Sequence, residues 1–163
     1  MSTFERVADL PIRIESCEIE DQDREYGDFT RPSTIIHLHG GGHEGVGEDV
    51  VYDVLDHIAH RDAGPVHDLS GPGTLGELCA LLAELDLFGS AAPVREASRL
   101  YRRWAYESAA LDLALRQSGV SLHAALGRDP KPVNFVCSTR LSSFGDDDPN
   151  STTDPVRRRL DKY

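Results

Sequence analysis

Hydrophobic and polar positions alternate along the first part of the chain. Isoleucines alternate with charged residues within Pro11–Ile19, which is the pattern of a half-buried strand. Ser33–His39 is rich in β-branched residues and predicts a second strand. After the glycines 40–42, the segment His43–Gly47 is placed to return antiparallel to it. These three segments predict a small antiparallel meander.

The segment that joins the first two predicted strands is strongly polar. Asp21–Arg31 carries six charged side chains, its two ends included, and only two aromatic ones, Tyr26 and Phe29. We expect a mobile surface loop in which these two aromatics are the adhesive points.

The pattern changes to a helical period after residue 48. Asp49–Arg61 predicts a helix that buries Val50, Val51, Val54, Leu55 and Ile58 and turns Asp53, Asp56 and His60 outward. His67–Gly73 is a predicted turn region. Thr74 and Glu77 then form a capping-box signature before a leucine-rich helix, with Gly89 as its C-terminal stop.

The longest predicted helix runs from Val94 to Ser118 and stops at Gly119. Its expected buried stripe consists of Leu100, Tyr101, Trp104, Ser108, Leu111 and Leu115. A short turn of helix follows at Ser121–Leu126. Val133–Cys137 is an apolar strand, and Asp154 before Pro155 predicts the start of a last helix. A lone strand has no partner among these elements, so the sequence looks like the front of a longer protein.

Length and composition indicate the class of protein and its cellular compartment. The chain has 163 residues, of which 39% are hydrophobic and 28% are charged, as in a globular domain. No apolar run approaches the roughly 18 residues of a membrane span, and Glu5, Arg6 and Asp9 interrupt any signal peptide. We therefore expect a cytoplasmic protein without a membrane partner.

The charge is strongly negative and unevenly distributed. The formal net charge is −11, and residues 1–94 hold 5 basic and 19 acidic side chains. Such a surface repels a phosphate backbone, so nucleic acid is not an expected partner. Three cysteines at wide spacings, Cys17, Cys79 and Cys137, indicate buried thiols rather than a disulfide framework or a zinc site.

Three groups of residues raise chemical possibilities that have structural alternatives. His37, His39 and His43, with Glu44 and Glu48, offer metal ligands, but strand residues that face solvent explain them more simply. The run from His39 to Gly42 is similar to the oxyanion segment of lipase-like α/β hydrolases, although no Gly-x-Ser-x-Gly follows and a hairpin turn suffices. Glu107 and Asp112 do not share a helix face, which favours ion pairs over paired catalysis.

Two longer motifs together carry a family resemblance. The segment Thr34–Tyr52 contains a β-branched strand, a glycine turn and the sequence Gly-Val-Gly-Glu. Ala105–Ala114 has the form Ala-x-Glu-x-Ala-x-x-Asp, and Gly119–Gly127 follows with Leu and Gly at family positions. At this spacing the pair resembles the N-terminal domain of the enolase superfamily, in its mandelate racemase and muconate lactonising branch. Ser121 departs from the proline that is usual there.

The resemblance implies a fold, and it implies that the N-terminal domain and the catalytic barrel have separate roles. The expected fold is α+β: a three-stranded antiparallel meander and a helical bundle at residues 1–130, then the first β/α unit of a truncated (β/α) barrel at residues 131–163. In the family the barrel binds Mg²⁺ and removes the α-proton of a carboxylate, in racemases, epimerases, cycloisomerases and dehydratases. The catalytic residues and the Mg²⁺ ligands lie on later barrel strands, so this chain is expected to be inactive alone. A homo-oligomer is expected for the parent enzyme.

The resemblance also implies which residues approach the small-molecule carboxylate substrate. They lie in two capping segments and at the mouth of the barrel: Arg24, Tyr26, Phe29, Arg31, Val51, Tyr52 and Thr139. Acidic neighbours, Asp23, Glu25 and Asp28, offer a structural alternative in which they neutralise the arginines. The rival functions are a fragment of an α/β hydrolase and a small acidic interaction domain that uses the Asp21–Arg31 segment.

Overall fold

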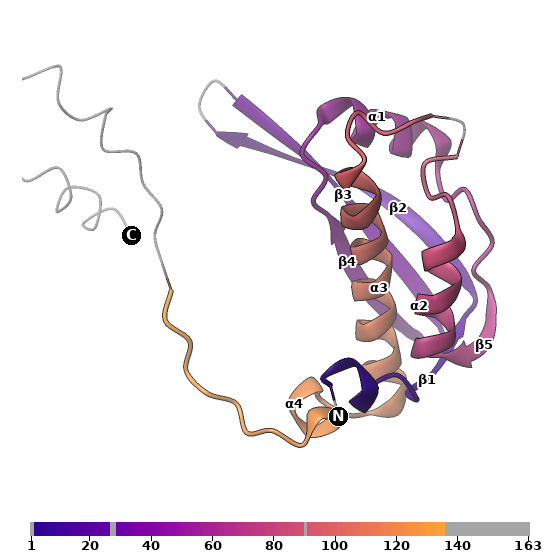
Figure 1. Ribbon diagram of the computed structural model, residues 1–163, viewed down its shortest axis with the longest axis vertical. Coiled ribbons are helices and arrows are strands. Elements are labelled where there is room, and N and C mark those ends of the chain that lie inside the picture. The colour runs from indigo at the N-terminus through magenta and orange to yellow at the C-terminus, as the bar shows by residue number, and fades with distance from the viewer. Residues whose placement is uncertain (1, 27–28, 90, 136–163) are drawn as a thin grey trace, which may run out of the picture. The chain divides into compact units, whose positions relative to one another are not determined.

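The computed structural model describes residues 2–26, 29–89 and 91–135, which are drawn as coloured ribbons in Figure 1. Residues Met1–Asp129 form one compact unit, and Pro130–Tyr163 form a second. Within the described part of the second unit, residues 130–135 contain no helix or strand, so the strand predicted from Val133 is not seen there. Its last two residues, Thr139 and the helix predicted from Asp154 lie outside the described residues.

The predicted meander is present, with longer strands than expected. β2 (Ser16–Tyr26), β3 (Phe29–Gly40) and β4 (His43–Asp49) form an antiparallel sheet in the order β2-β3-β4. Gly41 and Gly42 have φ angles of 57° and 76° and make the tight turn between β3 and β4. The glycine run is therefore a hairpin turn, as its simpler interpretation predicts.

The first predicted strand is divided into two strands that join different sheets. β1 (Pro11–Ile14) ends before Glu15 and pairs antiparallel with β5 (Gly71–Thr74). The prediction of a turn over His67–Gly73 is thus wrong at its C-terminal end. A strand made of Gly, Pro and Thr is tolerated because β5 lies at the edge of a two-stranded sheet.

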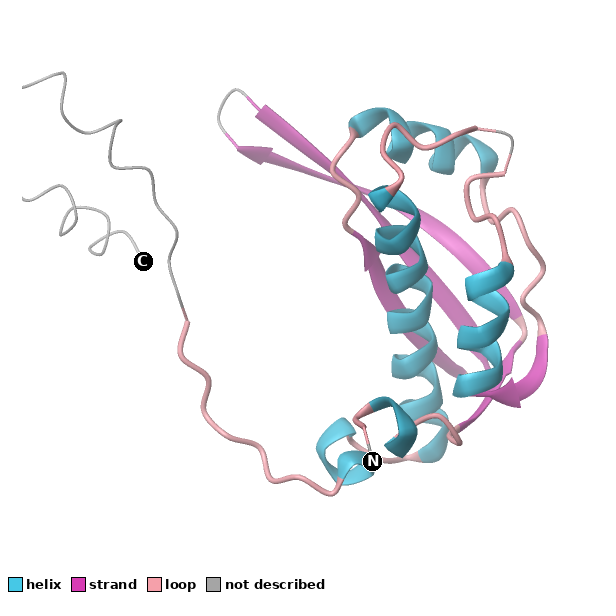
Figure 2. Cartoon of the chain, viewed as in Figure 1, coloured by secondary structure: helices cyan, strands magenta, loops and turns pink. Residues whose placement is uncertain are grey.

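In the described residues, four α-helices follow the order that the sequence predicts, and a short 3₁₀ turn precedes them (Figure 2). They are η1 (Phe4–Arg6), α1 (Val54–Ala63), α2 (Leu75–Glu84), α3 (Ala97–Ser118) and α4 (Leu122–Leu126). Thr74 and Glu77 cap α2 reciprocally, and Gly119 ends α3 in the left-handed region, as predicted. Gly89 is not the stop of α2, because that helix ends at Glu84.

The core lies between the strands, including β1, and the helices α2 and α3. Gly45 and Gly47 of β4 have no side chain because α3 crosses directly over them: a Cβ on Gly47 would collide with the Ala105 carbonyl, and one on Gly45 with the Ala109 carbonyl. Small residues on both elements therefore allow a close approach of strand and helix. The two motifs that carry the family resemblance are the two halves of this contact.

The predicted buried stripes of both amphipathic helices are wrong. On α3 the inward face consists of Ser98, Arg102, Ala105, Tyr106, Ala109, Ala110, Leu113 and Ala114, whereas Leu100 and Trp104 are exposed. On α1 the buried residues are Asp56, His57 and His60, while Val54, Leu55 and Ile58 are exposed. α3 turns its small residues inward because it packs closely on glycine. α1 turns its polar face inward because that face joins a buried polar cluster.

No helix in the described ranges is long and apolar enough to cross a membrane.

Candidate functional site

The segment Asp21–Arg31, predicted as a loop, is a two-stranded arm formed by the end of β2 and the start of β3. β4 ends at Asp49, opposite Thr34, but the pairing of β2 with β3 continues to the pair Tyr26–Phe29. Figure 1 shows this hairpin extending beyond the helices at the end of the sheet where α1 lies. The expectation of a mobile loop over Asp21–Arg31 is therefore wrong for residues 21–26 and 29–31, which are paired strands, while residues 27 and 28 lie outside the described residues. These strand ends consist of polar residues because pairing between β2 and β3 holds them in place and burial does not.

The strand register places Arg24 and Arg31 directly opposite each other. Side chains in such positions share a face and have Cβ atoms about 4.5–5.5 Å apart, and like charges there repel. Both side chains are exposed, and among the described residues neither forms a hydrogen bond or an ion pair. Two arginines on one face of adjacent strands offer donors that suit a carboxylate.

The acidic residues of the arm do not neutralise this pair. Asp23 and Glu25 alternate to the opposite face of the hairpin. The Asp23 carboxylate lies 2.6 Å from the Arg61 guanidinium, and Glu25 accepts a hydrogen bond of 2.8 Å from the Thr30 hydroxyl. The structural alternative is thus disfavoured for both acids, while Asp28 lies outside the described residues.

Arg61 on α1 braces the base of the arm, which sequence reasoning missed. Its guanidinium lies 3.1 Å from the Asp21 carboxylate and 2.6 Å from that of Asp23, and it donates to the Ser33 carbonyl at 2.7 Å. These contacts join residues about 30–40 positions apart, so no local pattern signals them. The arm is held to α1 at its root on the face opposite Arg24 and Arg31.

The segment after Gly-Val-Gly-Glu presents only one of its two predicted contact residues. Val51 is 2% exposed, and its amide donates to the Asp49 carboxylate at 3.1 Å. Tyr52 is 74% exposed, with the Arg95 guanidinium 5.4 Å from its ring centre. Tyr52 is therefore the residue of this segment that a ligand can reach.

A buried polar cluster holds this segment in place. Arg102 on α3 donates to the Asp49 carboxylate at 2.9 Å and to the Asp56 carbonyl at 2.7 Å. Its guanidinium lies over the Phe88 ring, 3.8 Å from the centre. His60 completes the cluster, 3.5 Å from the Asp49 carboxylate. Arg102 thereby connects β4, α1 and the segment before α3.

The ionisation of the cluster follows from its burial. Desolvation favours the protonated Asp49, but the close contact with His60 and the charge and hydrogen bond of Arg102 outweigh it and lower the Asp49 pKa. Desolvation lowers the His60 pKa, which its contact with Asp49 only partly offsets. Both groups are almost completely buried, so the cluster acts as a support for the surface and has no access to a substrate.

The histidines on the outer face of the meander pair with glutamates. His37 lies between two carboxylates, 2.7 Å from Glu44 and 3.0 Å from Glu20, and His39 stacks beside it with ring centres 6.3 Å apart. No group of three His, Cys, Asp or Glu side chains in the described part of the chain is arranged to hold a metal ion. Alternation on a solvent-facing strand accounts for these histidines.

The predicted ion pairs on α3 are confirmed. The Glu107 carboxylate lies 3.4 Å from the Arg103 guanidinium, and Asp112 lies 3.0 Å from that of Arg116. Asp112 also accepts a hydrogen bond of 3.1 Å from the Val46 amide on β4. This acidic position of the helix motif therefore holds the edge of the sheet.

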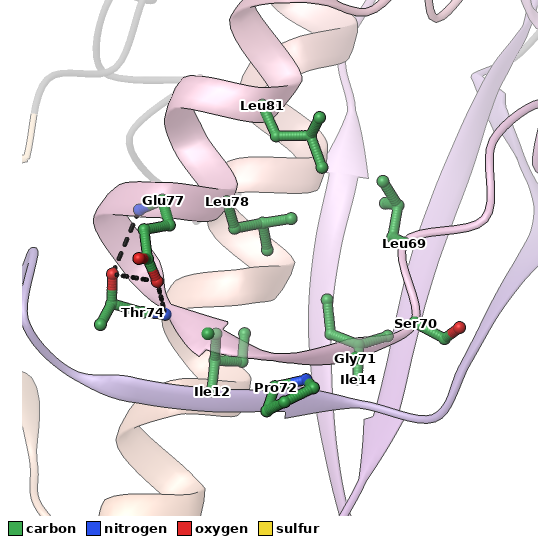
Figure 3. Close-up of a pocket in the computed structure, with 11 residues that line it drawn as sticks. Ile12, Ile14, Leu69, Ser70, Gly71, Pro72, Thr74, Glu77, Leu78 and Leu81 are labelled. Carbon is green, nitrogen blue, oxygen red and sulfur yellow. Dashed lines mark hydrogen bonds between the residues drawn. The ribbon is translucent and has the colours of Figure 1, made fainter.

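A cavity of about 350 Å³ lies between β1, β5 and α2, away from the arm (Figure 3). Ile12, Ile14, Leu69 and Leu78 line it with apolar atoms. Its one carboxylate, Glu77, is already bound to the Thr74 amide at 2.8 Å. Glu77 is thus engaged in capping α2, and Ser70 and Thr74 are the other polar side chains among the lining residues.

The two described cysteines are free thiols with little reactivity. Burial, with a smaller contribution from Glu18, raises the pKa of Cys17 to about 11, and burial raises that of Cys79 to about 11. Thiolate forms sparingly at neutral pH in such surroundings. Both thiols are free, as predicted, but they are partly buried and not fully buried, and Cys137 lies outside the described residues.

These features define an α+β domain whose meander projects an arm with two adjacent exposed arginines. Residues 5–125 match the family described as "Domain of unknown function (DUF8230) N-terminal domain". The match extends from η1 into α4 and covers more than half of the sequence, so the chain belongs to this family. No curated protein and no solved structure matches the chain.

Proposed function

We propose that residues 1–129 are the capping domain of an enolase-superfamily enzyme that acts on a small carboxylate. The observation that carries the proposal is the juxtaposition of Arg24 and Arg31 on a projecting arm, where no described acidic residue satisfies them. Like charges opposite each other destabilise a hairpin. A bound carboxylate offsets this repulsion by accepting hydrogen bonds from both guanidinium groups.

The packing of the two resembling motifs supports the same family. Gly45 and Gly47 fit against Ala105 and Ala109, so the glycine motif and the alanine motif require each other. A sequence that keeps both halves at this spacing keeps the contact of β4 with α3. This support concerns the fold of the domain, while the arm supports its binding role.

In this proposal the chemistry lies outside the described domain. In the resembling family, Mg²⁺ with its ligands and the residue that removes the α-proton belong to the barrel, which lies outside residues 1–129. The arm and Tyr52 exclude water and contact the part of the substrate distant from the reacting carbon. Tyr26 and Phe29, the last backbone pair of the arm, are assigned to the same role from the sequence.

Carboxylate binding by the chain itself tests the proposal. Isotope-labelled chain is titrated with succinate, and backbone amide shifts are followed by NMR, with uncharged succinamide as the ligand control. We expect saturable shifts in the arm with succinate alone, and an affinity at least about tenfold lower in Arg24→Gln and in Arg31→Gln. Arg13→Gln is the matched control, because Arg13 is also an exposed strand arginine.

The opposite result is equally clear. Shifts that are absent from the arm, or that fall by the same factor in Arg13→Gln, would mean that succinate senses only the general charge of the surface. The proposal of a carboxylate-binding cap would then be wrong.

A further inference from the structure

An apolar cavity lies where η1, α2 and α3 meet. It has a volume of about 290 Å³, and the buried Val7 and Leu75 line it together with the partly buried Cys79. Phe4 and Trp104 also line it, and because they are 50% and 61% exposed they stand at its rim. Figure 1 shows η1, at the N-terminus, near the end of α3 that is remote from the arm. The cavity is therefore separate from the arm and its two arginines.

The lining residues include one carboxylate, that of Glu107. Its side chain is 30% exposed, and the nearest cation, the Arg103 guanidinium, lies 3.4 Å away, which is longer than a good hydrogen bond. Burial raises the Glu107 pKa, and the charge of Arg103 offsets only part of this effect. Glu107 therefore holds an incompletely compensated negative charge beside apolar walls.

The walls of the cavity disfavour most classes of small molecule. An anion would meet the Glu107 carboxylate in a chain whose net charge is already −11. A neutral apolar molecule would remove water from the carboxylate without replacing its hydrogen bonds, which is costly. A metal ion needs several ligands, and no three His, Cys, Asp or Glu side chains in the described ranges are arranged to hold one. An organic cation with an apolar substituent meets none of these objections.

We propose that the cavity binds a small ammonium ion that carries an apolar substituent. The ammonium group donates to the Glu107 carboxylate, while the substituent packs on Val7 and Leu75. Trp104 lies three residues before Glu107 and thus on the same side of α3, so its ring is placed to attract the cation as well. The volume lies near the lower end of the range for ligand pockets, which suits one ring with a short chain. Arg103 is 35% exposed and can turn to solvent when the ligand displaces it.

Titration of the full chain with benzylamine tests the proposal, because benzylamine is a cation at neutral pH. We expect a saturable change in the fluorescence of Trp104, which is the single tryptophan of the chain. Backbone amide shifts followed by NMR should lie in η1, α2 and α3 and leave the arm unchanged. Benzyl alcohol has nearly the same shape without the charge, so it should bind at least about tenfold more weakly.

Two substitutions in one ion pair should have opposite effects on the Kd for benzylamine. Glu107→Gln removes the carboxylate and should raise the Kd at least about tenfold. Arg103→Gln removes the competing cation and should lower the Kd several-fold. A general loss of structure would weaken binding in both variants, so opposite signs separate a binding role from a structural one. Glu84→Gln is the matched control, because Glu84 is an exposed carboxylate of α2 that does not line the cavity.

Three results would overturn the proposal. If benzyl alcohol binds as tightly as benzylamine, the cavity is only an apolar depression. If the affinity for benzylamine falls by the same factor in Glu107→Gln and Glu84→Gln, the ligand senses only the general negative charge. If benzylamine produces no saturable change at Trp104, the cavity is closed to such a ligand, whether another part of the chain or a second copy covers it.

Discussion

Replacing Arg102 by methionine should strongly destabilise the domain. Arg102 is 1% exposed, and Asp49 beside it is completely buried. The substitution leaves the Asp49 carboxylate without its cation and removes the donor to the Asp56 carbonyl. Breaking a buried ion pair from one side costs about 3–5 kcal/mol. A typical domain has a total stability of about 5–15 kcal/mol, so this loss is a large share.

The same figure can be expressed as a change in melting temperature. Unfolding entropy is about 2.1 cal/mol/K per residue, which for the unit Met1–Asp129 gives roughly 0.27 kcal/mol/K. A loss of about 3–5 kcal/mol therefore lowers Tm by about 10–20 °C. Urea unfolding followed by circular dichroism at pH 7 measures the free energy directly.

Arg99→Met provides the matched control for Arg102→Met. Arg99 lies one turn earlier on α3 and pairs with Asp86 and Glu96, but its side chain is 38% exposed. An exposed pair contributes about 0–1 kcal/mol. If Arg102→Met costs no more than Arg99→Met, the reasoning that Arg102 holds the buried cluster together is wrong.

Three further predictions concern pH, packing and the arm. Stability should be complete above pH 6.5 and fall as the pH drops below it, because burial lowers the His60 pKa and the unfolded chain binds the proton first; His60→Gln should remove this step and leave the acid loss below pH 3.8 that Asp49 causes. Gly47→Ala should cost at least about 2 kcal/mol in urea unfolding, because the new Cβ meets the backbone of α3, and wild-type stability in this variant would contradict the close approach. In the enzyme that the proposal describes, Tyr26→Ala with Phe29→Ala should lower kcat/KM several-fold while Mg²⁺ affinity and Tm stay nearly unchanged; an activity loss that only follows Tm would assign the arm a structural role.

Features with a local physical cause were predictable from the sequence. The reciprocal contacts of Thr74 with Glu77 join residues three positions apart, and Gly119 supplies the left-handed conformation that ends α3. The β-branched strand and the glycine turn after it likewise depend on neighbours in the chain. The meander and the order of helices followed from such signals.

Features that depend on distant residues were not predictable in the same way. The arm is ordered by pairing across the hairpin and by Arg61 on α1, and neither leaves a periodic apolar pattern. The buried face of α3 was misassigned because its alanines are selected for closeness to Gly45 and Gly47, while bulkier side chains cover the outer face. The opposition of Arg24 and Arg31 follows only from the exact register.

The side-chain NMR signals of the two arm arginines test the central claim most directly. The account predicts that the Nε–H resonances of Arg24 and Arg31 shift together and saturably on addition of succinate, while that of Arg13 does not move, because both guanidinium groups of the arm donate to one ligand. If neither arm resonance shifts, or if all three shift alike, Arg24 and Arg31 do not form a carboxylate site and the capping role proposed for the arm is contradicted.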